Sequence, residues 1–220
     1  EASDPVERRA LLRSVERPGD RFVDVDQVDV GREVQLFAAE LAEYKGDRAK
    51  AEGYRGEAVD LGRRVQDLYV PGRGIWKCKL PDGSYNEVHH CYDFGVTLMT
   101  IGDMMPATQK REMVDFFVRE LKTPTWMRAL STKDLDVTFS IRPDHQWTGA
   151  YCSWPALALS GLFAAGAVDL ANDWIKGLAK TSMQGPYAQA HFTESFYTPE
   201  SNGAASKSPS DQPYINDWAC

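Results

Sequence analysis

Apolar residues recur at the spacing of an α-helix in six segments of this 220-residue chain. The first segment shows the i, i+3, i+4, i+7, i+8 pattern of a helix with one apolar face, formed by Val34, Phe37, Ala38, Leu41 and Ala42. Similar spacing predicts helices over 58–69, 92–101, 106–121, from 155 onward and over 170–178. The helix from 155 is apolar on nearly all sides, which indicates that other helices enclose it. The pattern therefore predicts an all-α fold.

The connections between these helices alternate between short and long. Short turns join the first helix to the second, the third to the fourth and the fifth to the sixth, and such turns make antiparallel helical hairpins. By contrast, the connections 71–90 and 123–153 and the segment 184–220 are long. Because short and long connections alternate, we expect all the long ones to lie on one face of the assembly. Loops of this length in a compact domain are usually functional.

Length and charge narrow the possible functions. The chain has the size of one domain, which we place at residues 31–220, and the charge-rich residues 1–30 are expected to form an N-terminal arm or the remnant of a preceding segment. Lys and Arg number 25 while Asp and Glu number 32, so the formal net charge is −7. An acidic chain without a long apolar segment predicts no nucleic-acid partner and no membrane association.

Four cysteines, Cys78, Cys91, Cys152 and Cys220, allow two disulfides in three connectivities. On that basis we expect a secreted or periplasmic protein, with a cytoplasmic location left open. The cysteine spacing fits no zinc motif, and the chain lacks the glycine-rich loops that bind nucleotides. We therefore expect no metal ion and no organic cofactor.

Aromatic and polar side chains of the kinds that bind sugars are concentrated in the long connections. A sugar ring stacks its C–H face on an aromatic ring, while its hydroxyl groups need directional hydrogen-bond partners. The residues that we expect to bind a carbohydrate substrate are Trp76, His90, Asp144, Gln146, Trp147, Tyr151, Trp154 and His191. Inverting hydrolysis of a glycosidic bond needs two carboxyl groups, an acid and a base, roughly 6.5–9.5 Å apart.

Several of these motifs occur in an order that resembles a known superfamily. Gln146-Trp147 precedes Trp154-Pro155-Ala156-Leu157, and a helical hairpin then leads to Gly185-Pro186 and Phe192-Thr193-Glu194. This order resembles the C-terminal half of the six-hairpin glycosidases, the (α/α)6-toroid hydrolases that include trehalase-like and glucoamylase-like enzymes. The resemblance covers residues 74–197.

The resemblance implies a fold, an activity and site residues. The fold would be helical hairpins forming part of an (α/α)6 toroid, and the activity would be inverting glycoside hydrolysis. Glu194 would be the general base. Asp93, in the segment Tyr-Asp-Phe-Gly, would be the general acid, with Glu87 as the alternative acid. Because a toroid needs twelve helices and six are expected here, a second chain or a further segment would complete it.

Other interpretations remain open for the same residues. Polysaccharide lyases and sugar epimerases also use (α/α) toroids, with His or Tyr as proton carriers, and His90 with His191 would suit them. A non-catalytic helical module that binds carbohydrate or protein is a third interpretation. In that case Trp147, Tyr151 and Trp154 would be core aromatics at a helix start, and Glu194 a solvated loop residue.

Overall fold

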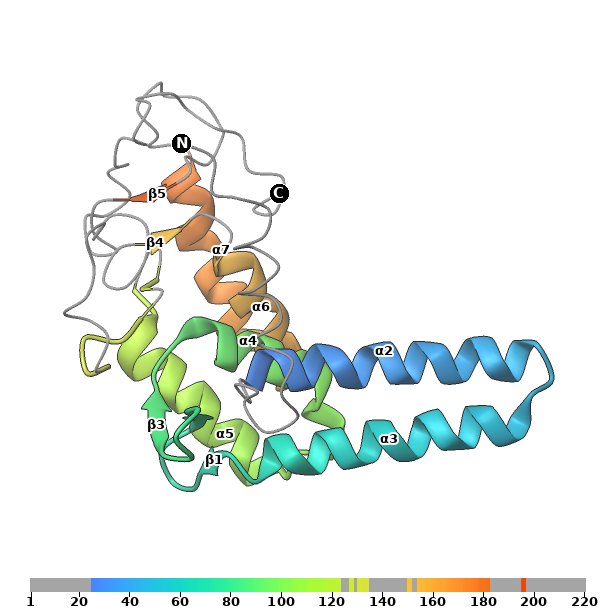
Figure 1. Ribbon diagram of the computed structural model, residues 1–220. Helices are drawn as coiled ribbons and strands as arrows, with labels where there is room; N and C mark the ends of the chain where they lie inside the picture. Colours follow the sequence, from blue (N-terminus) through green and yellow to red (C-terminus); the bar gives the residue numbers. More distant parts are fainter. Residues whose placement is uncertain are drawn as a thin grey trace, which may run out of the picture.

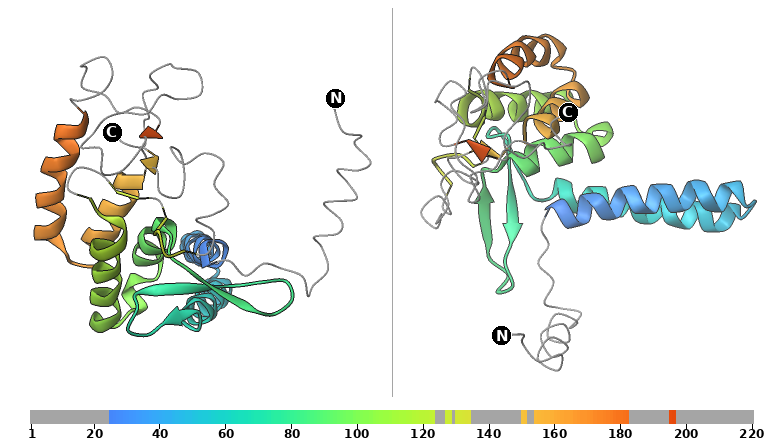
Figure 2. Two further views of the ribbon diagram at one scale, coloured as in Figure 1. Left: turned by 90° about the vertical axis from the view of Figure 1, so that its left-hand side faces the viewer. Right: turned by 90° about the horizontal axis from the view of Figure 1, so that it is seen from above.

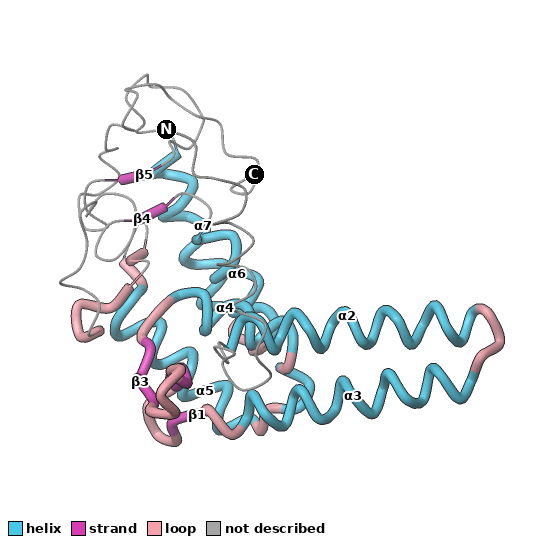
Figure 3. Tube along the Cα trace, viewed as in Figure 1, coloured by secondary structure: helices cyan, strands magenta, loops and turns pink. Residues whose placement is uncertain are grey.

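The computed structural model describes residues 25–123, 127–128, 130–134, 150–151, 154–182 and 195–196. Within these residues the chain forms six α-helices and five short strands (Figures 1 and 3). The helices are α2 (Val25–Tyr44), α3 (Arg48–Gln66), α4 (Cys91–Thr100), α5 (Ala107–Phe116), α6 (Trp154–Ala164) and α7 (Val168–Ser182). A 3-10 helix, η1 (Gly102–Met104), follows α4, and a π-helix, η2 (Phe117–Leu121), continues α5. The strands are β1 (Tyr69–Val70), β2 (Ile75–Lys79), β3 (Tyr85–Val88), β4 (Ala150–Tyr151) and β5 (Ser195–Phe196).

The helices form the three hairpins that the short connections predict. Gly46 and Gly166, in the turns that follow α2 and α6, have φ angles of 80° and 78°, which glycine adopts without the strain a side chain would bring. Asp47 caps α3, because its side chain accepts a hydrogen bond of 3.1 Å from the backbone N–H of Lys50. The third hairpin joins α4 to α5 through η1.

All five strands lie on one side of the helices, opposite the turn between α2 and α3 (Figure 3). Each strand belongs to one of the long connections or borders it. The prediction that the long connections share one face of the assembly is therefore confirmed for the described residues. The all-α prediction is confirmed in the same sense, since the strands have only two to five residues each.

The helices α2, α4 and α6 form a row. Glycines allow the close approach of α4 and α6, because a Cβ atom added to Gly95 would lie 2.7 Å from Leu157 Cγ, and one added to Gly161 would lie 3.1 Å from Gly95 Cα. Buried Arg32 joins α2 to the end of α4, since its guanidinium contacts the Thr100 carbonyl and lies 2.8 Å from Asp103 Oδ2.

Aromatic side chains from three helical segments fill the centre of the core. Phe94 of α4 stacks on Phe117 of η2, with ring centroids 4.7 Å apart, and Phe117 meets the edge of Trp174 of α7 at 5.1 Å. The indole N–H of Trp174 donates a 3.1 Å hydrogen bond to the Thr123 carbonyl, which satisfies its only polar atom. This cluster fixes α7 and η2 against α4.

The connection 71–90 folds into a sheet where the sequence predicted a loop. Strands β1, β2 and β3 pair antiparallel in that order, and Asp82 and Gly83 form the turn between β2 and β3. Gly83 has a φ angle of 86°, and Asp82 Oδ1 accepts a 2.9 Å hydrogen bond from the backbone N–H of Ser84. Two strands of five and four residues without regular apolar alternation give only a weak sequence signal.

Helix α2 differs from its prediction at its start and in the face that it buries. It begins at Val25, so the helix crosses the boundary expected between residues 30 and 31. The first 24 residues lie outside the described part of the chain, and the division into an arm and a domain therefore stays a prediction. Of the expected apolar face, Ala42 is buried, but Val34, Phe37 and Leu41 are exposed. Helix α3 packs instead against the face that carries Ala39 and Ala42.

Membrane helices and disulfides are absent from the described residues. None of the described helices combines the length and the apolar character needed to cross a bilayer. Cys78 lies in β2 and Cys91 begins α4, and no disulfide links cysteines within this part of the chain. Cys152 and Cys220 lie outside it. The predicted disulfides thus gain no support here, and the secreted or periplasmic location stays a prediction.

Candidate active site at the loop end of the helices

Two backbone pairings join the three long connections. His90 forms an isolated antiparallel bridge with Leu130, which links the first connection to the second. Strand β4 pairs with β5, so that Tyr151 stands opposite Ser195, which links the second connection to the third. Figure 1 shows β4 and β5 side by side near the end of α7, on the side where the other strands lie. Segments from three hairpins therefore meet at this end of the molecule.

His90 and Trp154 contact each other where these connections meet. Their rings pack edge to face, with centroids 5.7 Å apart and an interplanar angle of 84°. Burial lowers the pKa of His90 to about 4, although the nearby carboxylate of Asp134 acts in the opposite direction. At neutral pH the imidazole is therefore uncharged, so it offers one nitrogen as a hydrogen-bond donor and the other as an acceptor. Trp154 is the first residue of α6 and is half-buried.

Asp93, the expected general acid, lies in the first turn of α4 and is buried. Its position follows from the local sequence, because α4 begins at Cys91 directly after the bridge that fixes His90. The Asp93 backbone carbonyl accepts a hydrogen bond from the Thr97 hydroxyl one turn later. The structure thus places Asp93 within one helical turn of His90, at the end of α4 that meets the long connections.

Glu87, the alternative acid, lies on β3. Its carboxylate forms an ion pair of 2.6 Å with Arg73 and is half-exposed. It borders an open, polar pocket of about 420 Å³ lined by Arg73, Tyr85, Asn86, Glu87, His89 and Lys133. Glu87 therefore faces a different surface feature from the contact between His90 and Trp154.

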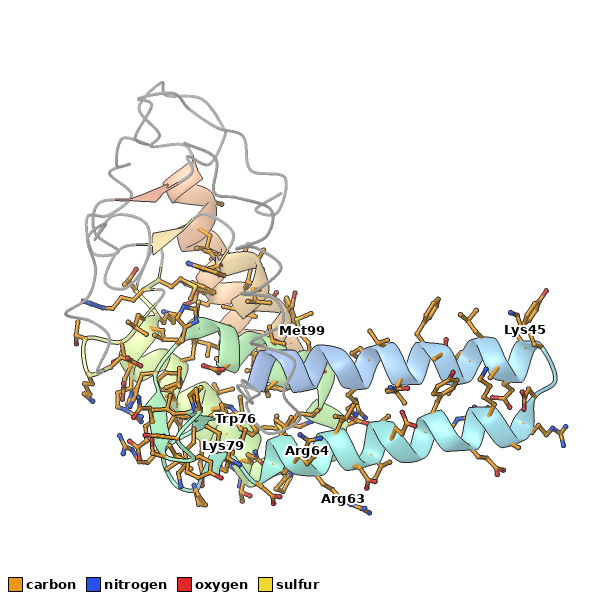
Figure 4. The ribbon with its side chains drawn as sticks, viewed as in Figure 1. Lys45, Arg63, Arg64, Trp76, Lys79 and Met99 are labelled. Carbon is orange, nitrogen blue, oxygen red and sulfur yellow. The ribbon has the colours of Figure 1, made fainter. Side chains whose placement is uncertain are left out.

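The prediction that Trp76 stacks on sugar is wrong. The side chain is only 1% exposed, so no substrate can reach its faces. Trp76 belongs to β2, where it pairs with Tyr69 and Val88, and its ring meets the Tyr69 ring at 5.1 Å. Figure 4 shows it inside the body of the molecule. Because the connection 71–90 folds into a sheet, its tryptophan becomes part of the core.

A buried hydrogen-bond network centred on Glu120 was not predicted from the sequence. Its carboxylate oxygens lie 2.9 Å from His89 Nδ1, 2.7 Å from the Ser131 hydroxyl and 3.2 Å from Lys133 Nζ. Asp134 Oδ2 accepts a 2.7 Å hydrogen bond from the backbone N–H of His89. The network therefore fastens segment 131–134 to the residues that precede α4, and so fixes the position of His90.

The charge of Glu120 is set by these partners. Burial alone raises its pKa, but hydrogen bonds from His89, Ser131 and Lys133 outweigh burial and hold the pKa at about 2. Glu120 is consequently ionised at neutral pH and cannot serve as a proton donor. The sequence carried a signal for the burial of Glu120 but not for its partners: Glu120 follows Phe116 by four residues and Phe117 by three, which is the spacing of one face of an α-helix.

Most of the expected contact residues of the second and third connections lie outside the described residues. These are Asp144, Gln146, Trp147, His191 and the expected general base, Glu194. Tyr151 belongs to β4, but its side chain is also outside the described part. Glu194 directly precedes β5 in the sequence.

Within the described residues, no group of three or more His, Cys, Asp or Glu side chains is arranged to hold a metal ion. Cys91 Sγ lies 3.9 Å from His90 Nδ1, and the two side chains alone would provide only two ligands.

Comparison with solved structures identifies the fold. No family model matches the sequence, and no curated protein matches it either. The chain superposes on neutral trehalase from Saccharomyces cerevisiae with a TM-score of 0.59 and 10% identity, over 76% of this chain and 32% of the trehalase. It superposes on the GH63 mannosylglycerate hydrolase from Thermus thermophilus, solved with glucose, with a TM-score of 0.63 and 14% identity. That match covers 97% of this chain and 50% of the hydrolase.

Both of these enzymes are (α/α)6-toroid glycosidases, so the chain has the fold of part of such a toroid. The fold that the sequence resemblance implied is confirmed. The chain spans half the length of one of these solved structures and a third of the other.

Proposed function

We propose that this chain forms the catalytic part of a glycoside hydrolase that cleaves a glycosidic bond with inversion. The observation that carries the proposal is the meeting of three long connections at the end of α4 and α6, through the bridge of His90 to Leu130 and the pairing of β4 with β5. The fold shared with a trehalase and a mannosylglycerate hydrolase supports the same activity. An oligosaccharide or glycan is the proposed substrate.

Asp93 and Glu194 are the proposed pair of carboxyl groups. A general acid must hold its proton at the working pH, which the buried position of Asp93 favours. Glu194 would take a proton from the attacking water as general base. It directly precedes β5, which pairs with the strand leading into α6, and this pairing supports a position near Trp154. Inversion requires roughly 6.5–9.5 Å between the two carboxyl groups, so that a water molecule fits between sugar and base.

His90 and Trp154 are the proposed contacts to the sugar. The half-buried indole of Trp154 offers a surface on which a sugar ring can stack, and the uncharged imidazole of His90 can bind a hydroxyl group. Tyr151 lies three residues before Trp154 and joins this group. By the sequence resemblance, we add four further substrate contacts, Asp144, Gln146, Trp147 and His191.

A hydrolysis assay with matched variants tests this proposal. Aryl glycosides, trehalose and mannosylglycerate are incubated with the protein, and the anomeric configuration of the first product is followed by proton NMR. We expect inversion, and a loss of kcat of about 10²–10⁴-fold in Asp93→Asn and Glu194→Gln. Glu87→Gln is the matched control, with kcat within about threefold of the parent. Full turnover in Asp93→Asn, or its loss in Glu87→Gln instead, would reassign the acid.

One observation favours a second candidate, a polysaccharide lyase. The half-buried, uncharged imidazole of His90 is a form that can accept a proton from a sugar carbon. A lyase releases an unsaturated sugar that absorbs ultraviolet light, whereas a hydrolase does not. Absorbance during turnover, abolished by His90→Gln and retained in Glu194→Gln, would favour the lyase over the hydrolase.

A further inference from the structure

A polar pocket lies between the β2–β3 hairpin and segment 131–134, apart from the contact between His90 and Trp154. Its volume of about 420 Å³ falls within the range of small-molecule sites, roughly 300–1,000 Å³. We call it the β-hairpin pocket, and its lining residues are Arg73, Tyr85, Asn86, Glu87, His89 and Lys133. Neither His90 nor Trp154 is among them, so a ligand bound there would occupy a second site.

His89 brings a buried and oriented imidazole to the β-hairpin pocket. Only 6% of its side chain is exposed, and its Nδ1 lies 2.9 Å from Glu120 Oε2. Because Glu120 is ionised at neutral pH, Nδ1 carries the proton of this hydrogen bond, and the neutral ring keeps a lone pair at Nε2. The ring also meets the edge of Phe116, with centroids 5.9 Å apart. These contacts fix the imidazole and leave Nε2 as the nitrogen available to a ligand.

The outer face of the β2–β3 hairpin extends the pocket with positive charge. Residues directly opposite each other on paired strands place their side chains on the same face. Lys77 stands opposite Glu87 and Lys79 opposite Tyr85, so both lysines share the face that borders the pocket. Trp76 lies on the other face, in the core, because side chains alternate along a strand. Figure 2 shows the hairpin reaching beyond the described helices.

The carboxylates near this face are already paired. Glu87 forms an ion pair of 2.6 Å with Arg73, and Glu120 forms one of 3.2 Å with Lys133. Arg73 and Lys133 keep further N–H groups, since a guanidinium has five N–H donors and an ammonium three. The two lysines of β2 form no ion pair with the described residues. On a chain with a net charge of −7, the region is therefore locally positive and suited to an anionic group.

We propose that the β-hairpin pocket binds an acidic saccharide, whose ring carries a carboxylate or a sulfate group. The anionic group accepts hydrogen bonds from Arg73 and Lys133. The ring hydroxyl groups bind the Asn86 amide and Nε2 of His89, and the ring stacks on Tyr85, which is 52% exposed. A simple inorganic anion would use only the cationic groups, whereas an acidic sugar uses the hydroxyl-binding and aromatic groups as well.

The second site deepens the proposed function, on which its role rests, by giving the oligosaccharide substrate an acidic ring bound away from the point of cleavage. His89 lines the pocket and His90 contacts Trp154, and their Cα atoms are about 3.8 Å apart because they are consecutive residues. Both sites thus adjoin the same segment of backbone. Binding to the pocket needs no turnover, so it is measured separately from hydrolysis.

Isothermal titration calorimetry on the whole chain at low salt tests the proposal. The probes are tetragalacturonate for the carboxylate and a carrageenan tetrasaccharide for the sulfate. Maltotetraose is the neutral saccharide, and inorganic pyrophosphate is the anion without a sugar ring. We expect one acidic saccharide to bind at least about tenfold more tightly than maltotetraose and pyrophosphate. Its binding should weaken as salt is added, and the tighter acidic probe identifies the anionic group.

Matched variants locate the binding. Lys77→Gln combined with Lys79→Gln removes two positive charges, and the dissociation constant of the acidic probe should rise at least about tenfold. Tyr85→Ala should raise it about three- to tenfold through the lost stacking surface. Lys45→Gln combined with Lys50→Gln is the control, since it removes the same charge near the tip of the α2–α3 hairpin, far from Lys79 (Figure 4). The control should change the dissociation constant by less than about twofold, with unchanged far-ultraviolet circular dichroism throughout.

NMR of the histidine rings shows whether the probe enters the pocket. We expect the acidic probe to shift the Cε1–H resonance of His89, which is assigned by its loss in His89→Gln. Absent binding, equally tight binding of maltotetraose or pyrophosphate, an unchanged dissociation constant in the Lys77 and Lys79 double variant, or an unshifted His89 resonance would each overturn the proposal. Hydrolysis without probe binding rejects this pocket and leaves the proposed function standing, whereas probe binding without hydrolysis does the opposite.

Discussion

Replacing Glu120 with glutamine removes one negative charge from a buried hydrogen-bond network and leaves the shape of the side chain nearly unchanged. In the parent protein the carboxylate accepts hydrogen bonds from His89, Ser131 and Lys133, which hold its pKa at about 2 against a usual value of 4.5. This difference corresponds to about 3 kcal/mol of stabilisation of the folded state. Because Lys133 is largely exposed, solvent screening reduces the expected value to about 2 kcal/mol.

The stabilisation depends on pH in a direction that follows from the lowered pKa. It is fully present above the pKa of the unfolded state, near 4.5, and is lost as the pH falls from there toward 2. Urea unfolding should therefore show Glu120→Gln to be less stable by about 2 kcal/mol at about pH 7, and by less than half of that at about pH 3.

Asp60→Asn provides the control, because Asp60 forms an exposed ion pair with Arg63. Its effect should stay within about 0.5 kcal/mol at either pH. If Glu120→Gln is as stable as the parent at about pH 7, or if its deficit does not shrink on acidification, the network does not hold the loop end together.

Three further substitutions test other parts of the structure. His90→Gln should flatten the pH dependence of stability between pH 6.5 and about 4. The lowered pKa of His90 makes the parent protein lose up to about 2–3 kcal/mol of unfolding free energy as the pH falls through that window, and urea unfolding of both proteins measures the difference. Gly95→Ala should destabilise the protein by about 1–3 kcal/mol, because the added Cβ would lie 2.7 Å from Leu157 Cγ. Gly56→Ala, whose added Cβ would have nothing within 4 Å, should stabilise it by about 0.5–1 kcal/mol, and thermal melts compare the two variants. Trp76→Phe should lower stability by about 1–3 kcal/mol and leave the KM of any saccharide unchanged, and a changed KM would restore Trp76 to the substrate site.

The helices and their order could be predicted because helix formation leaves a periodic trace in the sequence. The segment around Leu162 forms α6 as predicted, but it packs between α4 and α7 and leaves Phe163 exposed, so it is not enclosed on all sides. The glycines at 46 and 166 form tight turns, as short connections require. The alternation of short and long connections then predicted on which side the chain would place its strands. These inferences depend only on spacing and length.

The site was predicted less well, because it depends on contacts between distant segments. Glu120 and His89 are 31 residues apart, and no local pattern announces that a carboxylate will meet an imidazole there. Trp76 was misassigned for a related reason: pairing of β2 with β1 and β3 converts an expected loop into a sheet, and its aromatic ring into core. The lowered pKa values of His90 and Glu120 likewise arise from burial and partners that only the folded chain provides.

Helix α2 shows most clearly what periodicity alone does not predict. Apolar spacing identifies the face of a helix that is suited to burial, but it does not say whether the partner lies in the same chain. In α2 the small residues Ala39 and Ala42 contact α3, because alanine lets two helices approach closely, while Val34, Phe37 and Leu41 remain exposed. The apolar spacing of α2 thus identifies a helix face, but only the fold shows that Ala39 and Ala42, and not the larger side chains, are buried.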